Sequence, residues 1–219
     1  MELINLTGAK ELIDLTGTIL GYSGKARLSR IIKAITLSPL SHVSILAWIT
    51  KGDYIRWRVE HHLDPTSAVS WIEGLYIVES TDCVNPCLFA EQPISGAQVR
   101  PMSSFLDYEG RVWAYLPKDP LDAEERSWLT DAVLKLVGTK YDWSGAALAG
   151  TRFMNMFPCF RSKLHDRNTN YCAEVVGEGV MAWSKRRMPD IDWEPGRLRP
   201  RDVSRFVKAG LYQPSIRVR

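Results

Sequence analysis

The cysteine at position 172 stands where a thiol could act as a nucleophile. It follows the polar segment 168–170, "NTN", and opens a helical pattern over about 172–184. The unpaired N–H groups and positive dipole end of a helix N-terminus favour the thiolate, which is the attacking form. The side chains of segment 168–170 are good caps, so we expect Cys172 in the first turn. Free cysteines are also common as inert core residues, so position alone leaves both roles open.

A thiolate nucleophile needs a base within hydrogen-bonding reach, and a third polar group must orient that base. Of the four histidines, His42 opens the apolar run 42–49, "HVSILAWI". The other three fall in polar or irregular segments: His61, His62 and His165. His42 is therefore the candidate base, and the alternative is a core histidine bonded to the backbone.

A carboxylate in an apolar setting is the candidate for the third group. Glu79 follows four mostly apolar residues in the run 75–81, "LYIVEST". A half-buried acid generally needs a partner, and an imidazole on a neighbouring strand would serve. The carboxylate would fix the imidazole tautomer and stabilise the imidazolium. Glu60, at the end of another predicted strand, is the alternative, and an exposed strand-edge position for Glu79 also stays open.

Length and composition are those of an ordinary globular protein. The 219 residues are 45% hydrophobic and 24% charged, with eight Trp and eight Tyr that predict a substantial core or an aromatic-lined groove. No apolar run approaches the ~18–20 residues that cross a bilayer, so no membrane span is expected. The start of the chain lacks the basic and apolar regions of a signal peptide, which predicts a protein that is cytoplasmic as synthesised.

The cysteines leave one metal-binding alternative. In a chain without a signal peptide, the four cysteines are expected to be free thiols. Cys83, Cys87, Cys159 and His165 could be assembled into a zinc site, but the spacing lacks a second close pair. We therefore expect neither a metal nor an organic cofactor.

Positive charge gathers at the end of the chain. Residues 185–219 carry ten Lys or Arg against four acids, which gives +6 there and −3 for residues 1–184 within a net charge of +3. Such a segment could bind an anionic polymer, including nucleic acid. The favoured interpretation is a solvated face with acids opposite it, because no aromatic or glycine interleaving of the nucleic-acid type accompanies it. No stable nucleic-acid complex is expected.

The elements that would position these residues form an α+β pattern. Helical spacing or capping signals predict helices over 25–36, 122–138, 172–184 and 201–209. Strands are predicted over 18–23, 42–49, 54–60, 75–81, 97–101 and 111–116. The segment "TKGD" is interpreted as a hairpin turn that joins the second strand to the third, where Ile55, Trp57 and Val59 alternate with arginines.

Five segments in order resemble the permuted NlpC-type cysteine peptidases, a branch of the papain-like thiol hydrolases, with the YiiX-like proteins nearest. They begin at residues 18, 75, 96, 137 and 171: "TILGYSGKARLSRIIKAITLSPLSHVSIL", "LYIVEST", "GAQVRPMSSFLDYEGRVWAYL", "VGTKYDWSGAAL" and "YCAEVV". The resemblance implies a circularly permuted papain-like fold in which a central antiparallel sheet packs against helices. It also implies one domain over 1–219, with a core of about 17–183 and a basic extension over 185–219.

The resemblance assigns roles to individual residues. Cys172 would be the nucleophile, His42 the general base and acid, and Glu79 the orienting group. Tyr171, Tyr141 and Ser41 would line the substrate site, although core packing is the alternative for both tyrosines.

The resemblance also suggests a substrate and a setting. It implies cleavage of an amide bond in a peptide or acyl-amide substrate, with cell-wall (peptidoglycan) peptides first. Ester, lipid or isopeptide substrates stay open, as does a non-catalytic binding or structural protein, for example in a phage virion. Virion association or release on lysis would take the protein out of the cytoplasm. Segment 152–167 is an insertion relative to the short members and is expected to border the cleft.

Overall fold

A six-stranded antiparallel sheet lies at the centre of the molecule. The computed structural model describes residues 9–36, 38–90, 92–142, 169–190, 193–195 and 198–219. Strand order in the sheet is β4-β3-β2-β1-β5-β8. The strands are β1 (Ile19–Gly24), β2 (His42–Ile49), β3 (Gly74–Asn85), β4 (Ile94–Pro101), β5 (Gly110–Tyr115) and β8 (Ile216–Arg217). Two short strands, β6 (Lys140–Tyr141) and β7 (Thr169–Asn170), form a separate parallel pair.

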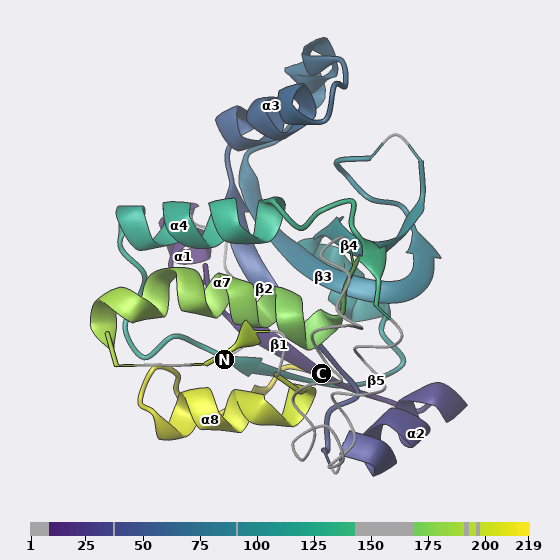
Figure 1. Cartoon of the computed structure of the whole chain (residues 1–219), viewed down its shortest axis with the longest axis vertical. Coiled ribbons are helices and arrows are strands. Elements are labelled where there is room, and N and C mark those ends of the chain that lie inside the picture. Colours follow the sequence, from purple (N-terminus) through teal and green to yellow (C-terminus); the bar gives the residue numbers. More distant parts are fainter. Residues whose placement is uncertain (1–8, 37, 91, 143–168, 191–192, 196–197) are drawn as a thin grey trace.

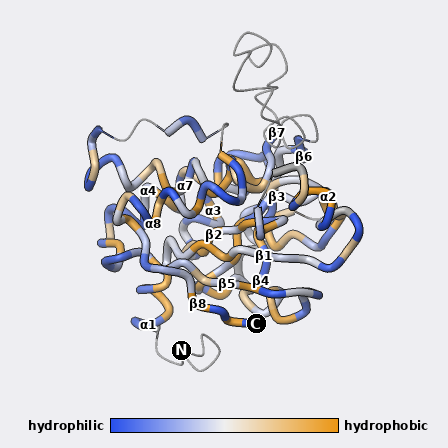
Figure 2. Tube along the Cα trace, turned by 90° about the horizontal axis from the view of Figure 1, so that it is seen from below, coloured by the Kyte–Doolittle hydropathy of each residue, from blue (hydrophilic) through white to orange (hydrophobic). Residues whose placement is uncertain are grey.

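Helices cover both faces of the sheet unequally. The helices are α1 (Ala9–Ile13), α2 (Arg27–Thr36), α3 (Lys51–Glu60), α4 (Ala123–Leu134), α7 (Cys172–Arg187) and α8 (Val203–Lys208). Short 3₁₀ helices lie at η2 (Pro65–Ser70), η3 (Met102–Asp107) and η6 (Pro200–Asp202). Helices α4, α7 and α8 lie on one face and α1 on the other (Figure 2). Helix α3 protrudes beyond the sheet, and α2 lies at the opposite end (Figure 1). The fold is thus α+β, as the sequence predicts.

Alternation along the strands divides the apolar residues into two clusters. In β2, Val43 and Ile45 are fully buried in the cluster that also holds residues of α4 and α7. Leu46 is equally buried but belongs to the second cluster, on the other side of the sheet. This is the period of two that a sheet buried on both faces requires. The fully buried Trp183 of α7 anchors the larger cluster.

Most of the predicted elements are confirmed within one to four residues at their ends. Five of the predicted strands correspond to β1, β2, β3, β4 and β5, and the four predicted helices to α2, α4, α7 and α8. The predicted capping box of α4 is also present: the Asp122 side chain accepts from Glu125 N, and Glu125 Oε2 accepts from Asp122 N.

The predicted strand over 54–60 is wrong, because this segment is helix α3. Thr50 caps it: its Oγ1 accepts from Asp53 N at 3.1 Å, and Asp53 Oδ2 accepts from Thr50 N at 2.9 Å. The segment "TKGD" is therefore a capping box and not a hairpin turn. Tyr54, Trp57 and Arg58 are the buried residues, at helical spacing. The strand prediction places Arg58 on the solvent side, but Arg58 is only 4% exposed, and its Nε donates to the Asp64 carbonyl at 2.6 Å.

The basic C-terminal residues meet acids at the start of α4. Arg186 Nη1 bonds to Glu124 Oε2 at 2.8 Å and to Asp122 Oδ2 at 3.1 Å. Arg187 Nε bonds to Glu125 Oε1 at 2.7 Å. Burial acts to raise the pKa of Glu125, but the hydrogen bond with Arg187 holds that pKa below its usual range. Part of the C-terminal charge is thus matched inside the fold, as the solvated-face interpretation expects. In the part of the chain that the structure describes, no helix has the length and apolarity to cross a bilayer.

We expect Thr50→Ala to lower the free energy of unfolding by about 0.5–2 kcal/mol, because the α3 cap would be lost. Urea denaturation followed by circular dichroism measures this change. The matched control is Thr50→Ser, which keeps the hydroxyl and should remain within a few tenths of a kcal/mol of the original protein. Equal stability of the alanine and serine variants would contradict the capping role.

Candidate active site

His42 and Glu79 form an ion pair on adjacent strands. His42 Nε2 lies 2.8 Å from Glu79 Oε2. Strands β2 and β3 are antiparallel neighbours with Ile45 opposite Val78, so Glu79 lies near the beginning of β2, where His42 stands. The side chain of His42 is 20% exposed and that of Glu79 is 7% exposed. Because Nε2 faces Glu79, Nδ1 is the ring nitrogen left to receive a proton from another group.

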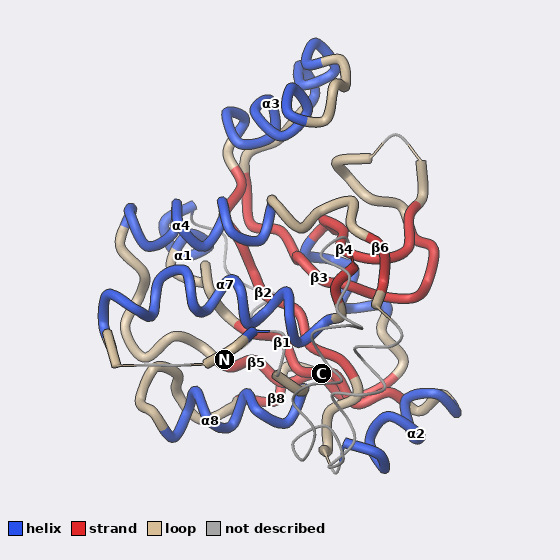
Figure 3. Tube along the Cα trace, in the orientation of Figure 1, coloured by secondary structure: helices blue, strands red, loops and turns tan. Residues whose placement is uncertain are grey.

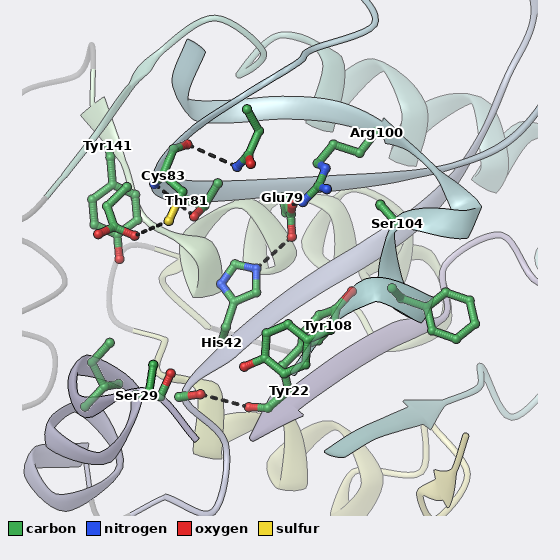
Figure 4. Close-up of a pocket in the computed structure, with 16 residues that line it drawn as sticks. Tyr22, Ser29, His42, Glu79, Thr81, Cys83, Arg100, Ser104, Tyr108 and Tyr141 are labelled. Carbon is green, nitrogen blue, oxygen red and sulfur yellow. Dashed lines mark hydrogen bonds and ion pairs between the residues drawn. The ribbon is translucent and has the colours of Figure 1, made fainter. Parts of the chain in front are cut away.

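Arg100 completes the surroundings of Glu79. Its Nη1 donates to Glu79 Oε1 at 3.1 Å, so each carboxylate oxygen has a different partner. The register accounts for this contact: Gln98 of β4 lies opposite Glu79, and Arg100 lies opposite Ile77, so Arg100 shares the face of Glu79. In Figure 4 the Arg100 guanidinium lies on the side of Glu79 away from His42. Arg100 is not among the residues predicted from the sequence, although an arginine in a buried strand is a signal that could have identified it.

Cys172 is the first residue of α7 and is 6% exposed. Its helix is attached to the sheet just ahead of the cysteine, where Ser80 Oγ donates to the Asn170 carbonyl at 2.6 Å. The predicted first-turn position is confirmed, but the predicted capping is not. Tyr171 is the N-cap residue and makes no side-chain cap, while Asn170 Nδ2 donates to Thr139 Oγ1 at 3.0 Å.

Electrostatics join the three residues. Burial acts to lower the pKa of His42, but charge on Cys172 and a hydrogen bond with it, followed by the hydrogen bond with and charge of Glu79, raise that pKa well above 6.5. Burial acts to raise the pKa of Glu79, but its bonds to His42 and Arg100 hold it below the usual value. The site therefore favours an imidazolium between a carboxylate and the sulfur.

Tyr22 packs against His42 from the neighbouring strand. Its ring centroid lies 5.2 Å from that of His42, and its hydroxyl is 3.0 Å from Ser44 Oγ. Burial and the charge of Glu79 raise the pKa of Tyr22, which keeps the phenol neutral. Tyr108 packs edge-on against Tyr22 at 4.8 Å (Figure 4). These rings restrict the rotation of the imidazole, and nothing in the sequence spacing had indicated them.

A pocket opens beside the ion pair, with a volume of about 310 Å³. It is bounded by β1, the start of β2, the far end of β3, α2, β4 and η3. The residues that line it are Tyr22, Ala26, Ser29, Ile32, Ser41, His42, Glu79, Thr81, Asp82, Cys83, Asn85, Arg100, Ser104, Phe105, Tyr108 and Tyr141.

The three residues predicted to bind substrate are placed differently. Tyr141 lines the pocket, and burial with the charge of Cys172 raises its pKa. Ser41 also lines it, but its hydroxyl accepts from Gly24 N at 3.1 Å and donates to the Tyr22 carbonyl at 3.2 Å. Tyr171 lies in the core, 3% exposed, where its hydroxyl donates to the Leu198 carbonyl at 2.9 Å. Tyr171 therefore packs in the core, which is the alternative role that the sequence leaves open for it.

The alternative site residues do not join this arrangement. Glu60 ends helix α3 and not a strand beside His42, so the carboxylate that reaches His42 is that of Glu79. Cys83 is exposed and Cys87 is buried. Cys159, His165 and the insertion 152–167 lie outside the described residues. Among the residues that are described, no three or more His, Cys, Asp or Glu side chains gather in a way that could hold a metal ion.

Comparison with known proteins gives a likeness among solved structures. No protein-family model matches the sequence, and no curated protein matches it significantly. Among solved structures, the chain is similar to the metalloprotein yiiX from Escherichia coli O157:H7 (DUF1105). The TM-score is 0.46 with 15% sequence identity, over 92% of this chain and 87% of that chain. The YiiX-like proteins, which the sequence resembles, take their name from this protein.

We expect the imidazole of His42 to stay protonated at pH 7, since its pKa is raised in the folded chain. Proton binding to His42 then stabilises the fold below the unfolded value of about 6.5, and this gain is lost as the pH rises through the folded-state pKa. Long-range ¹H–¹⁵N NMR of the histidine side chains, recorded from pH 5 to 10, measures that pKa.

Cys172→Ala is the informative variant for this titration, because Cys172 contributes most to raising the His42 pKa. We expect it to lower the His42 pKa more than Glu79→Gln does. A His42 pKa near 6.5 in the original protein, unchanged in Cys172→Ala, would contradict the coupling.

Proposed function

We propose that this protein is a thiol hydrolase in which Cys172, His42 and Glu79 form a catalytic triad. The observation that carries the proposal is the orientation of His42. Glu79 occupies Nε2 at 2.8 Å, which leaves Nδ1 for Cys172, the residue whose charge and hydrogen bond do most to raise the His42 pKa. A nucleophile, a base and an orienting group in this relation constitute the apparatus of acyl transfer.

The mechanism follows from these positions. His42 takes the Cys172 proton, and the thiolate attacks the substrate carbonyl carbon to form a carbon–sulfur bond and an oxyanion. The main-chain N–H of Cys172, at the start of α7, is the donor best placed by topology to bind that oxyanion. The imidazolium then protonates the leaving group as the acyl bond breaks. Water, deprotonated by His42, hydrolyses the thioester and restores the thiol.

Arg100 and Tyr22 support the base without entering the reaction. Arg100 balances the charge of Glu79, so the quartet of thiolate, imidazolium, carboxylate and guanidinium has no net charge. A neutral assembly costs less to hold in a half-buried site than an unbalanced one. The Tyr22 ring holds the imidazole in its plane beside Glu79.

The substrate class rests on the sequence resemblance. The order His42, Glu79, Cys172 along the chain is that of the permuted NlpC-type peptidases, so we propose a circularly permuted papain-like fold and an amide substrate. Cell-wall peptides are the first substrates to test. The same chemistry cleaves esters, so matched amide and ester substrates belong in one panel.

Alkylation of cysteine tests the activated pair directly. We expect iodoacetamide at pH 6 to label Cys172 faster than Cys83, although Cys83 is exposed and Cys172 is buried. Exposure alone favours Cys83, and only thiolate formation beside an imidazolium reverses that order. His42→Ala should remove the advantage of Cys172. Labelling is quantified by peptide mass, and faster labelling of Cys83 in the original protein would remove the basis of the triad.

Turnover tests the roles of the individual residues. On any cell-wall peptide or acyl amide that is cleaved, we expect no turnover from Cys172→Ala and a kcat/KM about 10²–10⁴-fold lower from His42→Ala. Glu79→Gln keeps a hydrogen-bonding side chain but loses the charge, and its kcat/KM should lie between those of His42→Ala and the original protein. Retained turnover in Cys172→Ala would refute the mechanism, and no turnover on the whole panel together with an unactivated Cys172 would favour a binding protein.

A further inference from the structure

Strand β3 changes its geometry where it borders the pocket. Its pairing with β4 is regular up to Thr81, opposite Gly96, and resumes at Asn85, opposite Ile94. Residues 82–84 of β3 therefore stand opposite Ser95 alone, which makes this segment an extended bulge. In a regular strand consecutive side chains point to opposite faces. Here the consecutive residues Thr81, Asp82 and Cys83 all line the pocket, so the bulge brings into it a carboxylate that regular pairing would turn away.

The two carboxylates of the pocket differ in how their charge is used. Glu79 is paired with both His42 and Arg100. Asp82 is half-buried, and its side chain accepts only a long contact of 3.7 Å from Cys83 Sγ within the described part of the chain. No cation of the described residues forms an ion pair with it. Asp82 thus carries into the pocket a negative charge that no cation of the described residues balances.

That charge lies on the Tyr141 side of the pocket. Cys83, Thr81 and Tyr141 form one wall of the pocket, and Arg100 lies on the other side of His42, beyond Glu79 (Figure 4). After burial, the charges of Cys172 and then Asp82 are the main causes that raise the pKa of Tyr141, so this tyrosine lies close to both. The pocket is therefore negative beside Tyr141, whereas the Arg100 charge at its far side is already paired.

We propose that Asp82 is a specificity residue that binds a cationic group, such as a protonated amine, on the substrate next to the bond that Cys172 attacks. This assignment rests on the proposed hydrolase function. Charge attraction is stronger in a half-buried pocket than at an open surface, and a carboxylate that no described cation balances lowers the affinity for anionic substrates by the same physics. The substrate class is thus amine-bearing acyl compounds, in preference to neutral or acidic ones.

Charged thiol reagents test the assignment without a known substrate. Aminoethyl methanethiosulfonate is cationic, sulfonatoethyl methanethiosulfonate is anionic, and the methyl reagent is neutral. In each case the Cys172 thiolate attacks the reagent's sulfenyl sulfur, a disulfide forms and methanesulfinate leaves. Rates at Cys172 are measured by peptide mass in a Cys83→Ser background, because Cys83 lines the same pocket.

We expect the cationic reagent to react faster than the anionic one, and Asp82→Asn to lower that rate ratio by about fivefold or more. Asp82→Glu, which keeps the charge, should restore much of the ratio. Asp107→Asn is the matched control: it removes one negative charge from η3, beside the pocket-lining Phe105 and Tyr108, at an exposed position outside the lining. Its ratio should stay within about twofold of that of the background protein.

The outcomes separate the two proposals. If Cys172 reacts rapidly in a His42-dependent way but the rate ratio is the same in Asp82→Asn, the assignment of Asp82 is overturned and the hydrolase function stands. If the neutral reagent reacts no faster with Cys172 than with the same residue in His42→Ala, the hydrolase function fails, and the assignment of Asp82 fails with it.

Discussion

The ion pair between His42 and Glu79 is the constraint on which the rest of the site depends. Two charged groups on adjacent strands are held where water is largely excluded, and such a pair persists only if every lone pair and proton has a partner. Glu79 meets this requirement through Arg100, and Arg100 is available because β4 pairs with β3 in one particular register. A shift of β4 by one residue would turn Arg100 to the other face and leave the carboxylate without its second partner. The register of β4 against β3 therefore determines whether the Glu79 carboxylate has Arg100 as its second partner.

Cys172 is brought to this pair by a different kind of contact. Helix α7 packs through an apolar face that includes the fully buried Val175, Val180 and Trp183. Apolar packing fixes a helix against a sheet but does not specify its position along its own axis. The hydrogen bond from Ser80 to the Asn170 carbonyl supplies that position, one residue beyond Glu79 in β3 and two before Cys172. A short polar contact therefore aligns two elements whose attraction is otherwise undirected.

The sequence predicts the parts of the fold that follow local rules. Alternation and helical spacing locate the sheet, and the α4 box is visible as Asp122 and Glu125 three residues apart. The capping box of Thr50 and Asp53 is not predicted. The alternation of Ile55, Trp57 and Val59 fits a strand, and the segment is too short for the pattern to exclude one. Period-two and helical patterns share several positions in a run of seven residues. Only the choice of cap distinguishes them here.

In the candidate site, the sequence predicts those residues that can be recognised without knowing which strands pair. His42 and Glu79 stand out because each is a polar residue in an apolar strand, and Cys172 because it opens a helix. Arg100 and Tyr22 escape notice because their roles depend on which strand lies next to which. Asp82 is missed because a bulge is a difference between two paired strands and cannot be recognised in the sequence of either strand alone.

The order of the elements along the chain has a consequence for biosynthesis. The β2–β3 pair that holds His42 and Glu79 is made early, whereas α7 leaves the ribosome only after most of the chain has been translated. A growing chain can therefore pair the imidazole of His42 with the carboxylate of Glu79 before Cys172 has been translated, so the proposed triad is complete only after α7 docks.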